Sequence, residues 1–137
     1  MTIKVVEDNT RKVLEALNKK IDVAGEIIGG MAESYAKDKC PVKTGRLQNS
    51  ITHGMSGAAI SKTYTANDGS PGGSYSGNLP KPNGNTKTVI IGTNVEYAPY
   101  VELGTVMPKR APHPFLQPAF EEHIDEYKEV LKTELSD

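Results

Sequence analysis

Residues 94–119 read N-V-E-Y-A-P-Y-V-E-L-G-T-V-M-P-K-R-A-P-H-P-F-L-Q-P-A, a short aromatic and apolar segment followed by a linker with four prolines. The aromatic and apolar residues fall at helical spacing, which predicts a short helix over residues 96–103. Gly104 is typical of the residue that ends such a helix. Because proline fixes the backbone angle φ, residues 106–118 are predicted to form a rigid proline-rich arm.

Both ends of the chain carry helical patterns outside this stretch. Apolar residues at alternating steps of three and four predict a long helix over about residues 10–37, ended by Pro41. A second apolar stripe predicts a C-terminal helix over residues 118–135, with Pro118 in its first turn. The stripe of the long helix consists of Leu14, Leu17, Ile21, Ala24, Ile28, Met31 and Tyr35.

The stripe of the long helix has two interpretations. It either faces the core of the chain or forms a coiled-coil seam. Gly25, Gly29 and Gly30 argue against an isolated coil, since each glycine costs ~1 kcal/mol relative to alanine in a helix. A core-facing stripe is favoured, with part of the helix free to pack on a neighbouring subunit. The glycines permit either a close approach of another element or a bend.

The middle of the chain is predicted to be rich in strands. Thr44 is placed to cap a very short helix. Residues 51–55 and 58–65 have the pattern of a hairpin, and the β-branched residues of 88–93 form the strongest strand. Residues 67–85 contain five glycines and three prolines and are predicted to be a long flexible loop.

These elements predict one α+β domain over residues 1–137. It would contain an antiparallel sheet of three to four strands, with a long N-terminal helix and a C-terminal helix packed on it. The length of 137 residues and the 36% of hydrophobic residues are typical of a single globular domain.

Composition also limits the classes of partner. A net charge of -1 gives no overall attraction to nucleic acid or to an anionic membrane. No apolar run reaches the ~18 residues of a transmembrane helix, and the N-terminus lacks the apolar segment of a signal peptide. We therefore expect no membrane association and synthesis in a cytoplasm. The single cysteine, Cys40, is expected to be a small residue at least partly buried before a proline.

No pattern in the sequence indicates a catalytic, metal-binding or cofactor-binding residue. His53, His113 and His123 lack the spacing of a metal-binding pair, and no G-x-S-x-G nucleophile motif is present. The segment G-S-P-G-G-S-Y-S-G lacks the lysine and the following helix of a phosphate-binding loop. The carboxylates near the C-terminus fall mostly on the solvent face of the predicted last helix.

A group of basic residues surrounds the predicted turn at Pro41. It consists of Lys37, Lys39, Lys43 and Arg46. Ordinary surface charge is the favoured interpretation. The alternative is a contact with an acidic partner ring or with DNA phosphates, which would make the affinity depend strongly on salt.

Three blocks of the sequence, in this order, resemble a family of minor tail components from the neck and tail-completion region of tailed bacteriophages. Residues 41–51, P-V-K-T-G-R-L-Q-N-S-I, follow the family pattern Pro-X-X-Thr-Gly-X-Leu-X-X-Ser-Ile. Residues 91–105, I-G-T-N-V-E-Y-A-P-Y-V-E-L-G-T, resemble its strand and following Tyr-Ala-X-X-Val-Glu-Phe-Gly-Thr element, with Leu103 where an aromatic residue is commoner. Residues 112–119, P-H-P-F-L-Q-P-A, match Pro-X-Pro-Phe-Leu-X-Pro-Ala. The residues of the first two blocks that carry the resemblance are Pro41, Thr44, Gly45, Leu47, Ser50, Ile51, Tyr97, Ala98, Tyr100, Val101, Glu102, Gly104 and Thr105.

The resemblance implies a structural virion protein of the head–tail neck that acts in tail completion or head–tail joining. A tail terminator or a head-closure protein of the same assembly is the alternative. The implied protein is assembled in the host cytoplasm as a six- or twelve-fold homo-oligomeric ring. Its neighbours would be the connector or head-closure protein and the tail-tube or terminator protein, and DNA would pass through the lumen without sequence-specific binding. No cofactor is implied.

The proline-rich arm supplies the candidate subunit contacts of such a ring. They are Arg110, Pro112, Pro114, Phe115, Leu116 and Pro118. Phe115 and Leu116 have a second interpretation, in which they anchor the last helix in the core of their own chain.

Two other classes of protein remain as alternatives. A nucleic-acid-binding module would use the basic residues of 37–46, although the near-neutral charge and the scarcity of basic–aromatic pairs argue against it. A small hydrolase would need His113 or Glu102 to be essential for turnover.

Overall fold

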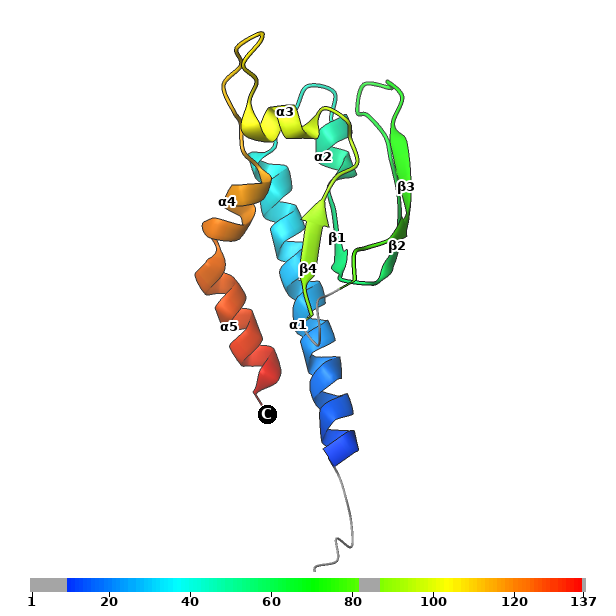
Figure 1. The fold of residues 1–137 in the computed structure, drawn as a ribbon, viewed down its shortest axis with the longest axis vertical. Coiled ribbons are helices and arrows are strands. Elements are labelled where there is room, and N and C mark those ends of the chain that lie inside the picture. The colour runs from blue at the N-terminus through cyan, green and yellow to red at the C-terminus, as the bar shows by residue number, and fades with distance from the viewer. Residues whose placement is uncertain (1–9, 82–86, 137) are drawn as a thin grey trace, which may run out of the picture.

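The computed structural model describes residues 10–81 and 87–136 of the chain. Figure 1 shows a long helix along the length of the molecule, with strands on one side and two shorter helices on the other. The α+β class is confirmed. The elements in chain order are α1 (Thr10–Lys39), α2 (Arg46–Ser50), β1 (Thr52–Met55), β2 (Ala59–Tyr64), β3 (Gly73–Asn78), β4 (Val89–Gly92), α3 (Ala98–Leu103), α4 (Leu116–Glu121) and α5 (Ile124–Leu135). None of these helices is both long and apolar enough to span a membrane.

The strands approach α1 closely because α1 carries glycines on that side. A Cβ atom at Gly25 would lie 2.5 Å from the sulfur of Met55, and one at Gly29 would lie 2.4 Å from the ring of His53. The His53 ring then lies between two carboxylates of α1, with Nε2 2.7 Å from Glu26 and Nδ1 3.2 Å from Glu33. Of the two roles that the sequence left open for these glycines, the structure shows close approach.

The four strands form two separate antiparallel pairs instead of the single sheet of three to four strands that the sequence predicted. β1 pairs with β4, with Thr52 opposite Gly92, and β2 pairs with β3, with Tyr64 opposite Gly73. The predicted hairpin over residues 51–65 is therefore wrong, because consecutive strands β1 and β2 belong to different sheets.

The segment 67–85, predicted as one long loop, contains the strand β3. Its sequence, G-S-Y-S-G-N, has no β-branched residue and has Tyr75 as its one residue of a strand-favouring type, so the strand signal is weak. Backbone pairing with the whole of β2 forms this strand. Residues 82–85 of the predicted loop lie outside the described residues.

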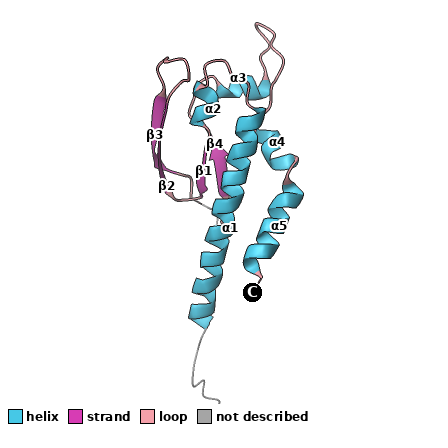
Figure 2. Cartoon of the chain, turned by 180° about the vertical axis from the view of Figure 1, so that it is seen from behind, coloured by secondary structure: helices cyan, strands magenta, loops and turns pink. Residues whose placement is uncertain are grey.

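The C-terminal helix predicted over residues 118–135 is two helices, α4 and α5, which begin at Leu116 and Ile124. Two contacts lie close to the break. The His123 ring stacks on the Tyr35 ring of α1, with centroids 3.5 Å apart, and the Tyr127 hydroxyl donates to the carbonyl of Ala119. Both views show α5 running beside α1 (Figures 1 and 2).

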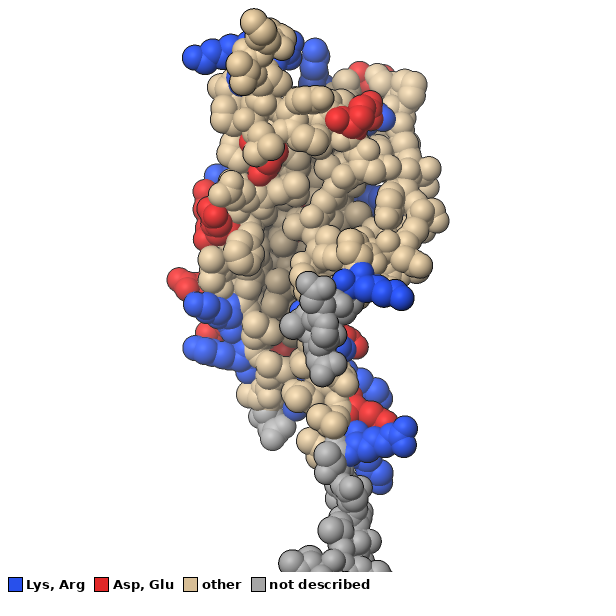
Figure 3. Space-filling model, in the orientation of Figure 1, with Lys and Arg blue, Asp and Glu red and all other residues tan. Residues whose placement is uncertain are grey.

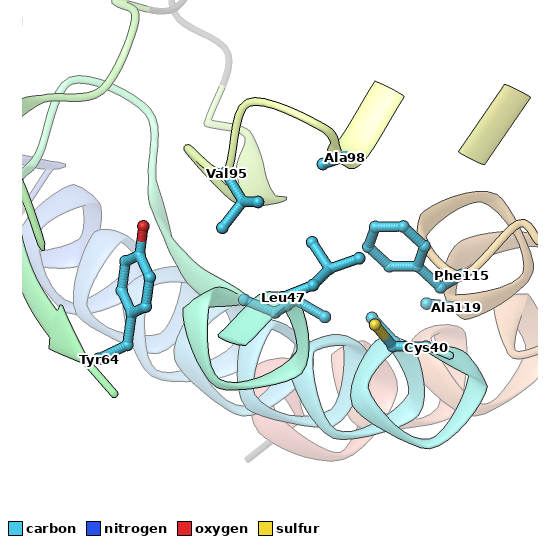
Figure 4. Packing of buried hydrophobic residues seen from close by; sticks show 9 residues of the cluster. Cys40, Leu47, Tyr64, Val95, Ala98, Phe115 and Ala119 are labelled. Carbon is cyan, nitrogen blue, oxygen red and sulfur yellow. The ribbon is translucent and has the colours of Figure 1, made fainter. Parts of the chain in front are cut away.

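The core lies where the upper part of α1 meets α2, α3 and α4, and its residues come from all three sequence blocks (Figure 4). Phe115 and Ile51 are fully buried at its centre. The cluster consists of Ala36, Cys40, Leu47, Ile51, Tyr64, Val95, Ala98, Phe115 and Ala119. The core lies at the C-terminal end of α1, whereas apolar side chains near its N-terminal end are exposed.

Two glycines give opposite expectations for stability. Gly45 has a φ of 84°, and a Cβ there would lie 2.3 Å from the Asn67 amide nitrogen, so Gly45→Ala should lower the free energy of unfolding by about 2 kcal/mol. Gly30 lies inside α1 with nothing within 4 Å of a built Cβ, so Gly30→Ala should raise it by up to about 1 kcal/mol. Urea unfolding of both variants measures the difference; equal effects would contradict the assigned backbone geometry.

Cys40 should be unreactive in the folded protein. Burial, with a smaller effect of the Glu102 carboxylate, raises the pKa of the Cys40 thiol to about 11, so the reactive thiolate is scarce below that pH. We expect slow reaction with an aromatic disulfide reagent at pH 8 and fast reaction after denaturation. Equal rates in both states would show that Cys40 is not buried in the core.

Candidate assembly surfaces

Glu102 joins the second sequence block to the third. Its carboxylate leaves α3 and accepts hydrogen bonds from three successive backbone amides at the start of α4, those of Phe115 at 2.8 Å, Leu116 at 3.1 Å and Gln117 at 3.0 Å. The N-terminal amides of a helix have no partners inside the helix, and its dipole favours a negative charge there. Glu102 therefore has a structural role at the junction of α3 and α4.

A second carboxylate joins the first block to the second. The Glu96 carboxylate accepts hydrogen bonds from both Nη atoms of Arg46, at 3.0 and 3.3 Å. The Arg46 guanidinium also lies 5.9 Å from the centre of the Tyr97 ring. The hydrogen bonds from Arg46 lower the pKa of Glu96 below its usual value. The blocks that carry the family resemblance are thus linked in space by two carboxylates.

The first block also supplies packing and local hydrogen bonds. The Thr44 hydroxyl accepts from the amide of Arg46 at 3.2 Å, and Gly45 takes the position before α2. The Ser50 hydroxyl donates to the carbonyl of Leu47 at 2.6 Å and is also hydrogen-bonded to the Thr93 hydroxyl. Leu47 and Ile51 are buried, whereas Pro41 is exposed.

The short helix α3 has a buried face and an exposed face. Ala98 is buried and Val101 packs against the core, while Tyr100 is 63% exposed and Leu103 is 75% exposed. Such large exposed apolar side chains on a six-residue helix offer a surface for a partner.

After α3, residues 105–110 form a projecting hairpin-like loop, which we call the finger. Thr105 and Arg110 exchange two backbone hydrogen bonds of 3.1 Å at its base, and the Thr105 hydroxyl donates to the carbonyl of Pro108. Its tip, Val106 and Met107, is 89% and 92% exposed. In Figure 3 the finger lies at the top of the molecule, with an uncharged tip and basic groups close to it.

The finger tip was absent from the candidate contacts that the sequence suggested. One signal in the sequence could have identified it. Val106 and Met107 are an apolar pair flanked by Thr105 and Pro108, with no apolar pattern around them that would place them in a core. Of the candidates that were named, Arg110, Pro112 and Pro114 are exposed, and Leu116 and Pro118 are half-buried.

Phe115 is the exception among these candidates. Its side chain is fully buried in the core of its own chain, so it has no surface to offer to another subunit, and the suggested contact is corrected to a core anchor. The arm is tied down just before it, where the amide of His113 donates to the carbonyl of Val101 at 2.8 Å.

The N-terminal part of α1 extends beyond the rest of the body, past the end of α5 (Figures 1 and 2). The stripe that is covered at Ala24 and Tyr35 continues there without cover. Val13, Leu14 and Leu17 are 62%, 53% and 42% exposed. One helical stripe is thus core at one end and free surface at the other.

The basic group around Pro41 is largely paired with acidic groups of the same chain. Lys37 Nζ lies 3.3 Å from Glu33, Lys39 Nζ lies 3.5 Å from Glu122, and Arg46 pairs with Glu96 as described. Of the four residues, Lys43 has no ion pair among the described residues. Intrachain pairing reduces the positive field that DNA phosphates would meet.

A groove of about 400 Å³ runs along α3, between the segment that enters this helix and the start of α4. Val95, Ala98, Pro99 and Leu103 give it apolar walls. Its ionisable residues are Glu96 and Glu102, and no basic residue lines it. We call this feature the α3 groove. Residues 10–81 and 87–136 contain no group of three His, Cys, Asp or Glu side chains that could hold a metal ion.

Comparison with known proteins gives one match. The model of the HK97-gp10-like family, described as "Bacteriophage HK97-gp10, putative tail-component", matches residues 3–104, which is more than half of the chain. This segment includes the first sequence block and all of the second except Thr105, and it ends at Gly104, just before the finger. No curated protein and no solved structure matches the chain.

The bonds of Glu102 predict a large effect of its removal. Glu102→Ala leaves three amides at the start of α4 without their acceptor and should lower the free energy of unfolding by about 2–3 kcal/mol. Glu129→Ala, an exposed carboxylate of α5, is the control and should change it by less than about 0.5 kcal/mol. Urea titrations of the two variants give the comparison, and equal midpoints would show that the Glu102 contact contributes nothing.

Proposed function

The chain belongs to the HK97-gp10-like family of bacteriophage tail components, and from that premise we propose that it is a structural protein of the head–tail neck. It acts in tail completion or head–tail joining by forming a homo-oligomeric ring, six- or twelve-fold, around the DNA channel. Its neighbours are the connector or head-closure protein on one face and the tail-tube or terminator protein on the other. The family is described as a putative tail component, which supports a structural role in the tail of the virion and gives no support to an enzyme.

The uncovered end of α1 is the observation that carries the proposal of a homo-oligomer. Leu14 and Leu17 continue the stripe that packs on the body of the same chain, yet about half of each side chain is open to water. Full burial of a leucine stabilises by about 1.5–3 kcal/mol relative to full exposure. Covering this end of α1 with a second copy would recover part of that free energy at every subunit boundary of a ring.

The second support is the position of the exposed surfaces. The free end of α1 and the finger lie at opposite ends of the molecule (Figure 1). The core between them, which includes Phe115 and Ile51, is complete within one chain. A folded subunit with free apolar surfaces at both ends suits an assembly in which each copy contacts several neighbours.

A nucleic-acid-binding module is less well supported. Three of the four basic residues around Pro41 are paired with carboxylates, and Lys43 is the one of the four without an ion pair among the described residues. In the proposed ring, DNA passes through the lumen without sequence-specific contacts. Binding of short duplex DNA that weakens steeply between 50 and 200 mM salt, as expected of proteins with several phosphate contacts, would favour the module instead.

Truncating the uncovered stripe should weaken assembly. We expect the full chain to form closed rings, seen as a single high-mass species by native mass spectrometry and as rings by electron microscopy. Leu14→Ser/Leu17→Ser should shift it toward monomer, with at least a tenfold increase in the concentration needed for assembly, because roughly 1.4 kcal/mol gives a factor of ten.

The matched control changes two exposed polar residues on the opposite face of the same helix, Lys12→Ser/Lys19→Ser, and should leave the rings intact. Added tail tubes and purified connectors should retain the wild-type rings. A wild-type chain that stays monomeric and binds neither structure contradicts the proposed function.

A further inference from the structure

We propose that the finger of one copy docks in the α3 groove of the next copy, which makes the ring contact head-to-tail. This inference rests on the proposed ring, for which it identifies a specific contact. The finger is residues 105–110, and the groove runs along α3 of the neighbouring chain.

The finger cannot gain its stability from burying its own tip. Val106 and Met107 are 89% and 92% exposed, more than any other large hydrophobic side chain among the described residues. A tip of this kind costs solubility unless a partner covers it. Its base is already closed by the backbone bonds between Thr105 and Arg110, so docking orders little additional chain.

Charge identifies the site that receives the finger. Lys109 and Arg110 follow the apolar tip, and residues 105–113 contain no carboxylate. The described part of the chain gives Lys109 and Arg110 no ion-pair partner. Of the hollows found on the described residues, the α3 groove is lined by Glu96 and Glu102 without a basic residue, whereas the hollow between the sheets contains Lys62 and the one beside the finger contains Arg110. The basic finger therefore matches the acidic-rimmed, apolar α3 groove.

Both carboxylates of the groove also have hydrogen-bond partners in their own chain. Arg46 holds Glu96 in its ionised form by two hydrogen bonds, and the Glu96 side chain remains 72% exposed. Glu102 is fixed by the amides of α4. Because Arg46 largely offsets the charge of Glu96, a cation arriving from outside meets chiefly the carboxylate of Glu102, whose position is fixed, and this favours correct orientation of the partner.

The arrangement of the two features suits a ring. The finger leaves the C-terminal end of α3, and the groove extends back to the segment before its N-terminal end, at Val95. Figure 1 shows α3 lying across one end of the molecule, with the finger rising at one side. Because the two surfaces differ, the contact is heterologous, and heterologous contacts generate rings when the rotation closes.

Two variants remove one side of the contact each. Val106→Ser/Met107→Ser removes the apolar tip, and Leu103→Arg places a cation at the wall of the groove, where it repels Lys109. All three positions are at least 75% exposed, so the fold should be retained. Val42→Ser, at a position 55% exposed and outside both features, is the control.

Sedimentation and native mass spectrometry of the full-length variants test the proposal. Each variant should lose closed rings, with association at least about tenfold weaker, and the control should assemble like the wild type. An equimolar mixture of the tip variant and the groove variant should give dimers but no rings, since it contains one intact finger–groove pair for each two chains. Dimers in the mixture alone are the specific mark of a head-to-tail contact.

Charge gives an independent test. Lys109→Glu should weaken association by about tenfold, and Lys109→Arg should restore it, because the groove attracts a cation of either kind. The wild-type association should also weaken as salt is added.

The outcomes separate this inference from the proposed function. If the wild type forms rings and the tip variant forms them equally well, the finger–groove contact is wrong while the ring stands. If tip-variant rings form but no longer bind tail tubes, the finger faces the tube and the proposal is overturned. A wild type that remains monomeric overturns both.

Discussion

The contact between Glu102 and the start of α4 is the interaction on which the arrangement of the C-terminal third depends. Its carboxylate accepts from three successive amides, at 2.8, 3.1 and 3.0 Å, and thereby fixes Phe115 at the centre of the core. Because Glu102 contacts the amide of Phe115, the two ends of the segment between them lie close together, and the segment must reverse its direction. The finger is the result, and at its base the amides of Thr105 and Arg110 each donate to the carbonyl of the other residue. The core and the projecting finger therefore both depend on the buried Phe115 side chain and on the Glu102 carboxylate that holds the start of α4.

The sequence predicted well those features that follow from local rules. The 3.6-residue period and Pro41 gave the long helix nearly to its end at Lys39, and Gly104 ended α3 as expected. Non-local pairing could not be predicted. β3 has no β-branched residue, and it is a strand because its backbone pairs with that of β2. The break between α4 and α5 also lacked a signal, because the stacking of His123 on Tyr35 involves residues 88 positions apart (123 - 35).

The sequence identified the segment that carries the candidate surface, but it did not show which residues of that segment are buried and which are exposed. The conspicuous aromatic residue of the arm, Phe115, became the centre of the core, whereas the inconspicuous pair of Val106 and Met107 became the exposed tip. Periodicity cannot distinguish these roles in a segment rich in proline, since it has no regular face. For α1 the period gave the stripe correctly, but the same stripe is covered at Ala24 and open at Leu14, because other elements reach only one end of the helix.

A complete core and two uncovered apolar surfaces are what the proposed assembly requires of a subunit that folds before it assembles. The most direct test of that account is a structure of the purified full-length assembly by electron cryomicroscopy. The account predicts a closed ring around an open lumen, in which Leu14, Leu17 and the finger tip are buried against neighbouring copies. A ring in which these side chains remain in water, or a particle without a lumen, would contradict it.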